Sequence, residues 1–181
     1  TPRAQVQHAT EFLLRLIQKG ALKLTRPVPQ KVTYHDPCYL GRQSEPPQAW
    51  QGEERHTHGV MTYFVPPKPL NYGTNGVFDA PRQILCLIPG LEFAEMQRIR
   101  EYAYCCGGGG SVPETHPNVA RTAALHRIDE AEATGAEVLV TACQHCRGNF
   151  NRWREDESIP VKDIVELVFE AAGLDADGGA V

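Results

Sequence analysis

The sequence has no long apolar run and no surplus of basic residues, and both absences exclude functions. Its apolar runs, such as residues 138–140, fall far short of the roughly 20 residues that a membrane-spanning helix needs. We expect no secretory segment before the first helix. With 18 Lys and Arg against 22 Asp and Glu, the formal net charge is -4, whereas nucleic-acid binders usually carry a basic balance or stripe. We therefore expect a cytoplasmic protein that does not bind nucleic acid.

Six cysteines are present, but the compact Cys-x-x-Cys-x-x-Cys run that usually holds a cubane iron–sulfur cluster is absent. Disulfide frameworks belong mainly to short secreted chains, whereas helical and strand patterns account for most of these 181 residues. The adjacent Cys105 and Cys106, together with the pair Cys143 and Cys146, are typical of thiolates kept reduced for metal or redox chemistry. We therefore interpret the cysteines as reduced and ligand-forming rather than as a disulfide framework.

Alternating strand and helix patterns predict an α/β fold in which helices flank a small, largely parallel sheet. The expected helices are residues 10–19, with Thr10 as the N-cap, and residues 80–88, 117–133 and 164–169. The expected strands are residues 31–35, 91–96 and 137–141, with a last short strand at Val161. Ligand sites of such sheets gather beyond the carboxyl ends of the strands, and Cys38 and Cys143 both fall there. The loops that bind a cofactor are therefore expected at the strand C-terminal ends.

Residues 43–76 break this pattern, because they combine several prolines and glycines with two histidines among charged residues. Such a stretch is not expected to build a core of its own, and a loop this long in a compact domain is usually functional or mobile. Trp50, Tyr63, Phe64 and Tyr72 nevertheless suggest that it folds down onto something. It is either a surface insertion or a loop that docks a partner or covers a substrate.

Five cysteines on three separate segments are candidate metal ligands: Cys38, Cys105, Cys106, Cys143 and Cys146. A zinc site would use four ligands in a closed tetrahedron, and a cubane cluster also uses four, usually from a compact run. Five thiolates from three loops suit an iron–sulfur cluster of unusual shape better than either. Gly107 and Gly108, which follow the adjacent cysteines, would let backbone amides approach the cluster sulfides as cofactor-binding groups.

Four residues near these cysteines or elsewhere have competing interpretations. Cys86 stands between two leucines on the expected apolar side of a helix, so we interpret it as a packing residue. His35 and His145 are catalytic candidates, since each could donate a hydrogen bond near a cluster or supply a proton. Asp36 could do the same, although stabilising the turn before the following proline is an equal alternative.

The chain resembles a known family at four places, which are residues 35–42, 77–82, 105–110 and 143–146. These segments look like the cysteine-rich CCG domain of heterodisulfide reductase-type iron–sulfur oxidoreductases, and the resemblance covers roughly residues 32–172. It implies an oxidoreductase domain that holds a noncubane [4Fe-4S] cluster and acts on a disulfide-type substrate. Carried over position by position, the five cysteines named above are the expected cluster ligands, one of them bridging two irons.

The chain departs from this family in two ways. Simpler members join Arg42 and Val77 almost directly, where this chain has its insertion, and family proteins commonly carry two such domains and a ferredoxin-like region. We therefore expect residues 1–181 to be a single domain from a longer chain, or a subunit that receives electrons from iron–sulfur or flavin partner subunits. Any membrane association would be indirect, through a complex.

Three hypotheses about function remain open at this point. The main one is a heterodisulfide reductase-like enzyme of sulfur metabolism that transfers electrons to or from a disulfide, either a small molecule or a protein. The second is an electron-relay or structural module of a respiratory complex that has no substrate of its own. The third is a zinc-binding interaction domain. Access to the cysteines separates the first two hypotheses, and metal analysis separates the third.

Overall fold

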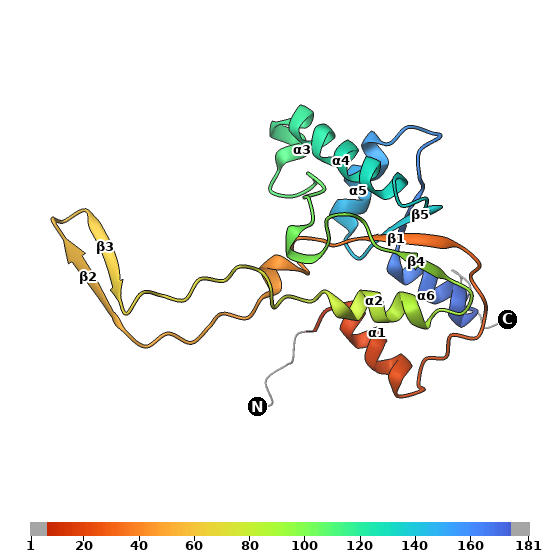
Figure 1. Ribbon diagram of the computed structural model, residues 1–181, viewed down its shortest axis with the longest axis horizontal. Coiled ribbons are helices and arrows are strands. Elements are labelled where there is room, and N and C mark those ends of the chain that lie inside the picture. Colours follow the sequence, from red (N-terminus) through yellow and green to blue (C-terminus); the bar gives the residue numbers. More distant parts are fainter. Residues whose placement is uncertain (1–6, 175–181) are drawn as a thin grey trace.

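Helices on both sides of a four-stranded parallel sheet form the body of the molecule, as Figure 1 shows for a computed structural model that describes residues 7–174. The strands, in the spatial order β4-β1-β5-β6, are β4 (Glu92–Ala94), β1 (Lys31–His35), β5 (Val138–Thr141) and β6 (Val161–Asp163). The helices are α1 (Ala9–Gln18), α2 (Asp79–Leu87), α3 (Val112–Thr115), α4 (Pro117–Glu132), α5 (Gln144–Trp153) and α6 (Ile164–Ala172). The α/β fold that the sequence predicts is confirmed.

The two central strands, β1 and β5, set the geometry of everything at their carboxyl ends. Every residue of β5 is buried, as are all of β1 except Lys31, which is the pattern expected of strands covered on both faces. The strands run parallel, with Val32 opposite Val138 and His35 opposite Thr141. Because His35 and Thr141 are the last residues of their strands, the loops that follow leave the sheet side by side.

Separate apolar clusters lie on the two faces of the sheet. One packs α1, α2 and α6 against side chains such as Val32 and Val140, and the other packs α4 and α5 against Leu139. Figure 1 shows these two helical layers above and below the strands. The second cluster includes Cys106 and Cys146, so two candidate ligands are built into the core. Within residues 7–174, no helix has both the length and the apolar character needed to cross a bilayer.

The ends of two helices test the capping predictions. Helix α6 begins as expected after Asp163, whose carboxylate accepts from the backbone N–H of Val165 at 2.9 Å. Helix α1 begins differently, and Thr10 as its N-cap was wrong. His8 takes that position, because its ring accepts from the Thr10 amide while Glu11 accepts from the His8 amide. Histidine is not one of the residues usually found at an N-cap, so the sequence pattern did not identify this position.

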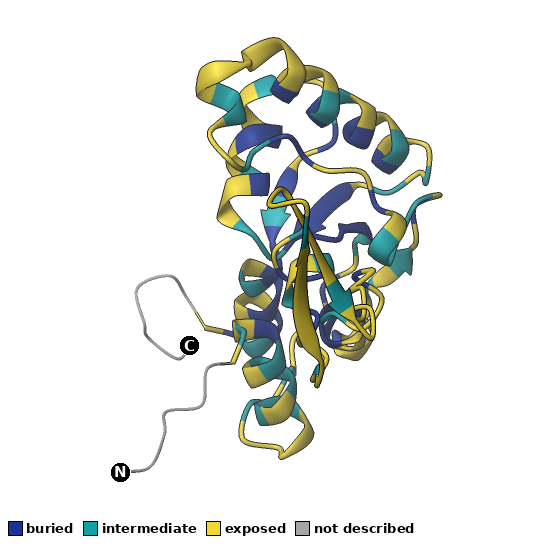
Figure 2. Ribbon diagram, turned by 90° about the vertical axis from the view of Figure 1, so that its left-hand side faces the viewer, coloured by how far each residue is buried: buried dark blue, intermediate teal, exposed yellow. Residues whose placement is uncertain are grey.

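Residues 43–76 form an arm that extends away from the body in Figure 1, and Figure 2 shows the hairpin at its tip coloured mostly as exposed. Its tip is an antiparallel hairpin of β2 (Glu53–Thr57) and β3 (Met61–Val65), whose residues are mostly exposed. The expectation that its aromatic residues fold down was wrong, since Tyr72 is 73% exposed. Trp50 and Phe64 pack on each other instead, with ring centroids 5.5 Å apart. The arm therefore does not cover the cysteines.

Candidate metal centre

Three cysteine-bearing segments meet at the carboxyl ends of β1 and β5. Cys38 follows β1 by three residues, and Cys143 lies between the end of β5 and the start of α5. Cys146 is in the first turn of α5, while Cys105 and Cys106 lie on the loop between a short 3-10 turn at Arg100–Tyr102 and α3. The side-by-side exit of the β1 and β5 loops brings these segments together, as the strand pattern predicted.

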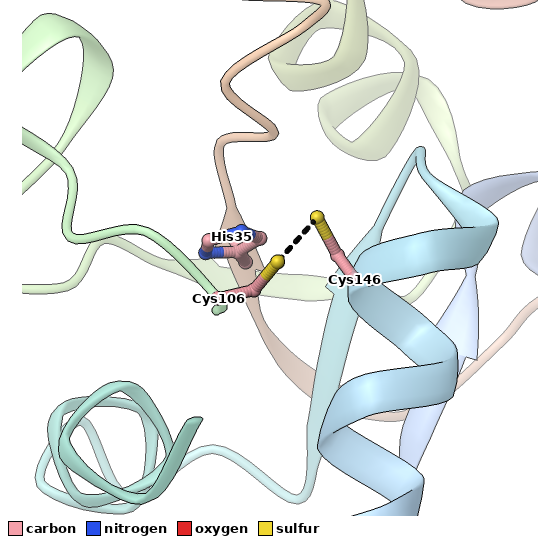
Figure 3. A group of neighbouring side chains, drawn as sticks. All are labelled: His35, Cys106 and Cys146. Carbon is pink, nitrogen blue, oxygen red and sulfur yellow. Dashed lines mark hydrogen bonds between the residues drawn. The ribbon is translucent and has the colours of Figure 1, made fainter. Parts of the chain in front are cut away.

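Two sulfur atoms at the buried end of the site are in direct contact. The Cys106 and Cys146 sulfurs lie 3.0 Å apart, as the dashed line in Figure 3 marks. One ring nitrogen of His35 and both of these sulfurs lie within 4.8 Å of one another. All three side chains are buried, whereas Cys38 and Cys143 are half-buried and Cys105 is exposed. The candidate ligands therefore run from the core to the surface.

The pKa values of the thiols are linked from one cysteine to the next. Hydrogen bonds lower the pKa of Cys105, with the larger effect from Cys106 and the next from Cys38. The same contacts raise the pKa of Cys106, to about 12, and also raise the pKa of Cys38. Contacts with Cys106 and Cys143 raise the pKa of Cys146. Without a cation, three thiols therefore keep their protons and donate them to thiolate neighbours.

Cys143 is expected to be the more reactive end of the pair that it forms with Cys146. A hydrogen bond from the Cys146 thiol has the largest effect and lowers the pKa of Cys143. Burial opposes it, the backbone amides of His145 and Cys146 add to it, and the resulting pKa is about 6. Because the thiolate is the nucleophile, iodoacetamide should alkylate Cys143 in the metal-free chain faster than buried Cys146 at neutral pH. Peptide mass spectrometry should show this rate falling as the pH drops through about 6. Equal rates for both cysteines would contradict this assignment.

The glycines after Cys106 are required by packing inside the protein itself. The amides of Gly107 and Gly108 point at the sulfurs of Cys105 and Cys106, each at 3.3 Å. A Cβ atom on Gly108 would lie 2.6 Å from the carbonyl oxygen of His145. Gly107 has a φ of +77°, and a Cβ there would lie 2.7 Å from a carbonyl of α4. The backbone amides of Gly107 and Gly108 can therefore approach the cysteine sulfurs only because these two residues have no side chain.

Gly108→Ala is expected to destabilise the chain by about 1–3 kcal/mol, because the added methyl group overpacks a rigid backbone contact with His145. Gly109→Ala is the matched control, since a Cβ there meets nothing closer than the Tyr39 ring at 3.6 Å. Urea unfolding followed by circular dichroism measures both variants. Equal stabilities of the two variants would show that the contact at Gly108 relaxes without cost.

His35 lies in a fully buried setting that the sequence did not reveal. Its ring accepts a hydrogen bond at Nδ1 from the Nε of Arg127 over 3.1 Å, and the Phe150 ring meets it edge-on at 5.0 Å. Burial, and then the positive charge of Arg127, lower the pKa of His35. A solvent-facing proton shuttle at His35 is therefore not supported by its surroundings. Arg127 was missed, because arginine on a helix is exposed by default.

Asp36 ties the end of β1 to α2 instead of facing the cysteines. Its carboxylate accepts hydrogen bonds from both terminal nitrogens of Arg82, at 2.7 and 2.9 Å. It also accepts one from the backbone amide of Arg100, at 2.8 Å. The hydrogen bond to cluster sulfur considered for Asp36 is therefore wrong, and its structural role is an ion pair. Arg42 has a related task, since it donates to the carbonyls of Glu101 and Ala103 before the cysteine loop.

Cavities lie on two sides of the cysteine site. A cavity of about 690 Å³ opens beside Cys143 and is also lined by Tyr39, Leu40 and Phe78. A smaller one of about 210 Å³ is lined by His145, Tyr39 and the glycine loop. His145 is exposed there, at the surface end of the site. Cys86 does not line either cavity and is exposed on α2, so its interpretation as a packing residue was wrong.

Fold and site together define a class of protein, namely a parallel α/β domain with five cysteines gathered at the carboxyl edge of its sheet. The chain belongs to the cysteine-rich (CCG) domain family, whose sequence profile matches residues 61–151. That span contains four of the five candidate ligands, and Cys38 precedes it.

Three relatives align with nearly the whole chain. It is 37% identical, over 94% of its length, to one subunit of the dihydromethanophenazine:CoB–CoM heterodisulfide reductase of Methanosarcina barkeri. It is 29% identical, over 96%, to a Bacillus subtilis protein named "Probable iron-sulfur-binding oxidoreductase FadF". It is 34% identical, over 94%, to a Chromohalobacter salexigens protein named "Probable membrane-anchored ferredoxin". The chain spans 34% of the first relative and 21% of the other two.

Proposed function

We propose that this chain is an iron–sulfur oxidoreductase domain that binds a noncubane [4Fe-4S] cluster through Cys38, Cys105, Cys106, Cys143 and Cys146. It acts within a longer protein or complex, in electron transfer to or from a disulfide-type substrate. The observation that carries the proposal is the convergence of these cysteines from three segments onto one edge of the sheet. The names of a heterodisulfide reductase subunit and an iron–sulfur-binding oxidoreductase among the relatives support it.

The chemistry of the donor set fits such a group. Thiolates are soft ligands that suit iron–sulfur clusters, and a cation would relieve the repulsion that keeps protons on Cys38, Cys106 and Cys146. The amides of Gly107 and Gly108 already donate to cysteine sulfurs, as expected around a cluster. A bound cluster would supply single electrons and iron sites open to sulfur.

The cavity beside Cys143 favours an enzyme over an electron relay. A relay needs no path for a substrate, whereas about 690 Å³ of space reaches Cys143. The base of the arm, with Ser44 and Gly76, lines this cavity, while the hairpin at the tip of the arm lies away from the body (Figure 1). Tyr39 and Phe78 give this cavity apolar walls that would exclude water from a bound disulfide. His145 is exposed at the smaller cavity, which shares Tyr39 with the larger one, and is the proposed proton donor, because two-electron reduction of a disulfide to two thiols takes up two protons.

Partners follow from this assignment. Electrons would come from an iron–sulfur or flavin subunit of the same assembly. The Methanosarcina barkeri relative is named as one subunit of a reductase, which supports the presence of partner subunits. Membrane association would be indirect, through the complex, and would need no spanning helix in residues 7–174. A relative is named as a membrane-anchored ferredoxin, which makes a membrane-bound assembly a reasonable setting.

Iron and acid-labile sulfide quantification on protein made with intact iron–sulfur assembly tests this function. Iron and sulfide are expected in equal amounts, with an electron paramagnetic resonance signal that changes when disulfides are added. A chain without iron refutes the proposal, and stoichiometric zinc in its place favours the zinc-binding alternative. An iron signal that no disulfide changes favours the relay.

A further inference from the structure

The contact between Arg127 and His35 determines which nitrogen of the imidazole carries a proton. Arginine Nε donates to Nδ1 of His35 over 3.1 Å. A guanidinium group has only donors and stays protonated, so Nδ1 must present its lone pair. In an imidazole whose Nδ1 accepts a hydrogen bond, the remaining proton lies on Nε2. His35 is thus a neutral ring with a single outward donor, Nε2–H.

Both partners of this contact are held in place. Arg127 is 0% exposed, and its Nη1 donates to the Glu130 carboxylate at 2.6 Å and to the Arg98 carbonyl at 2.8 Å. On the other side, the Phe150 ring stands perpendicular to the His35 ring. Because α4 and α5 supply these neighbours, the orientation of the imidazole is set by the packing of two helices.

Since Arg127 occupies Nδ1 of His35, Nε2 is the ring nitrogen left to face the cysteine sulfurs. This atom is buried and has no hydrogen-bond partner among residues 7–174, which is costly for a donor unless something outside the protein accepts from it. A His35 ring nitrogen lies within 4.8 Å of the Cys106 and Cys146 sulfurs, and Arg127 already occupies Nδ1. Figure 3 shows the ring beside the two sulfurs.

We propose that Arg127 is a positioning residue that fixes His35 as a hydrogen-bond donor to sulfur around Cys106 and Cys146, and so prevents His35 from serving as a metal ligand. Ligation through Nε2 would need a lone pair that this tautomer does not have. The inference rests on the proposed function, because the donor acts on the cluster. Hydrogen bonds to cluster sulfur stabilise the more negative, reduced form and raise the reduction potential.

Nitrogen NMR of histidine labelled with nitrogen-15 in the ring tests the tautomer, in the iron-loaded and in the metal-free chain. His35, assigned by the signal that is lost in His35→Gln, should show a protonated Nε2 and an unprotonated Nδ1. In Arg127→Met this preference should weaken, because Nδ1 loses its donor. A protonated Nδ1 in the unmutated chain overturns the proposal, even if Arg127→Met fails to fold.

The reduction potential of the iron-loaded chain tests the consequence. Arg127→Met should shift it to more negative values. Arg98→Met is the matched control, because Arg98 pairs with the same Glu130 carboxylate without contacting His35. In a His35→Gln background, Arg127→Met should shift the potential no further than Arg98→Met does. Equal shifts in both backgrounds would mean that only charge is at work and would overturn the positioning role.

The two measurements distinguish a failure of this inference from a failure of the proposed function on which it rests. A chain without iron refutes the proposed function, while NMR on the same chain still decides whether Arg127 sets the tautomer. An iron-loaded chain whose potential does not respond to Arg127→Met retains the function and refutes the inference.

Discussion

Cys106→Ser is expected to abolish most iron binding. Cys106 lies in the middle of the series, since its thiol affects the pKa of Cys105 on one side and contacts the Cys146 sulfur on the other. A serine hydroxyl stays protonated at neutral pH and is a harder ligand than a thiolate, so it cannot replace the sulfur. Iron and sulfide content, with the electron paramagnetic resonance signal, measure the loss.

Cys86→Ser is the matched control for Cys106→Ser. Cys86 is exposed on α2 and lines neither cavity beside the site, so the variant should keep the full iron content. Thermal unfolding of both metal-free variants shows whether Cys106→Ser acts through ligation or through the core that Cys106 shares with Phe150. Undiminished iron and an unchanged spectrum in Cys106→Ser would contradict the ligand assignment.

Arg82→Met should cost about 3–5 kcal/mol of folding stability, the range for breaking one side of a buried ion pair. The side chains of Asp36 and Arg82 are 2% and 9% exposed, and the pair is bidentate. Burial lowers the pKa of Arg82, but hydrogen bonds to Asp36 and Glu95 together raise it, so the guanidinium stays charged. The variant leaves the Asp36 carboxylate in the core without its cation.

Arg100→Met is the control for Arg82→Met, because Arg100 pairs with Asp79 at the surface. Exposed pairs contribute only about 0–1 kcal/mol, so this variant should unfold at nearly the same urea concentration as the unmutated chain. Urea titration at constant pH measures both variants. Similar losses in both would mean that water reaches Asp36 once Arg82 is removed.

The convergence of the cysteine segments could be predicted from the sequence, because ligand sites of parallel sheets lie beyond the carboxyl ends of the strands. A buried β-branched run ending near Cys143, and a strand ending near Cys38, place both cysteines at the same edge of a parallel sheet. Glycines after Cys106 predicted backbone close to sulfur, although not the contact of Gly108 with the His145 carbonyl. Which backbone lies opposite a loop depends on how α5 packs, and no local pattern contains that information.

Charged residues explain most of what the sequence did not reveal. Arg127 and Arg82 look like surface positions, and only their partners in space, Glu130 and Asp36, make their burial possible. The hairpin at 53–65 was not predicted, because Glu53, Glu54 and Arg55 lack the alternation that marks a half-buried strand. Strands without a buried face carry no hydrophobic period to detect.

The wide separation of the cysteine segments has a consequence during synthesis on the ribosome. In the sequence, 108 positions separate Cys38 from Cys146, so roughly 5–20 s pass between their translation at ordinary speeds. Strand β1 cannot pair with β5 before then, because β5 follows residue 137. Delivery of iron and sulfide must therefore wait until α5 has left the ribosome, and during that interval Cys38 is open to oxidants without the thiols that later surround it.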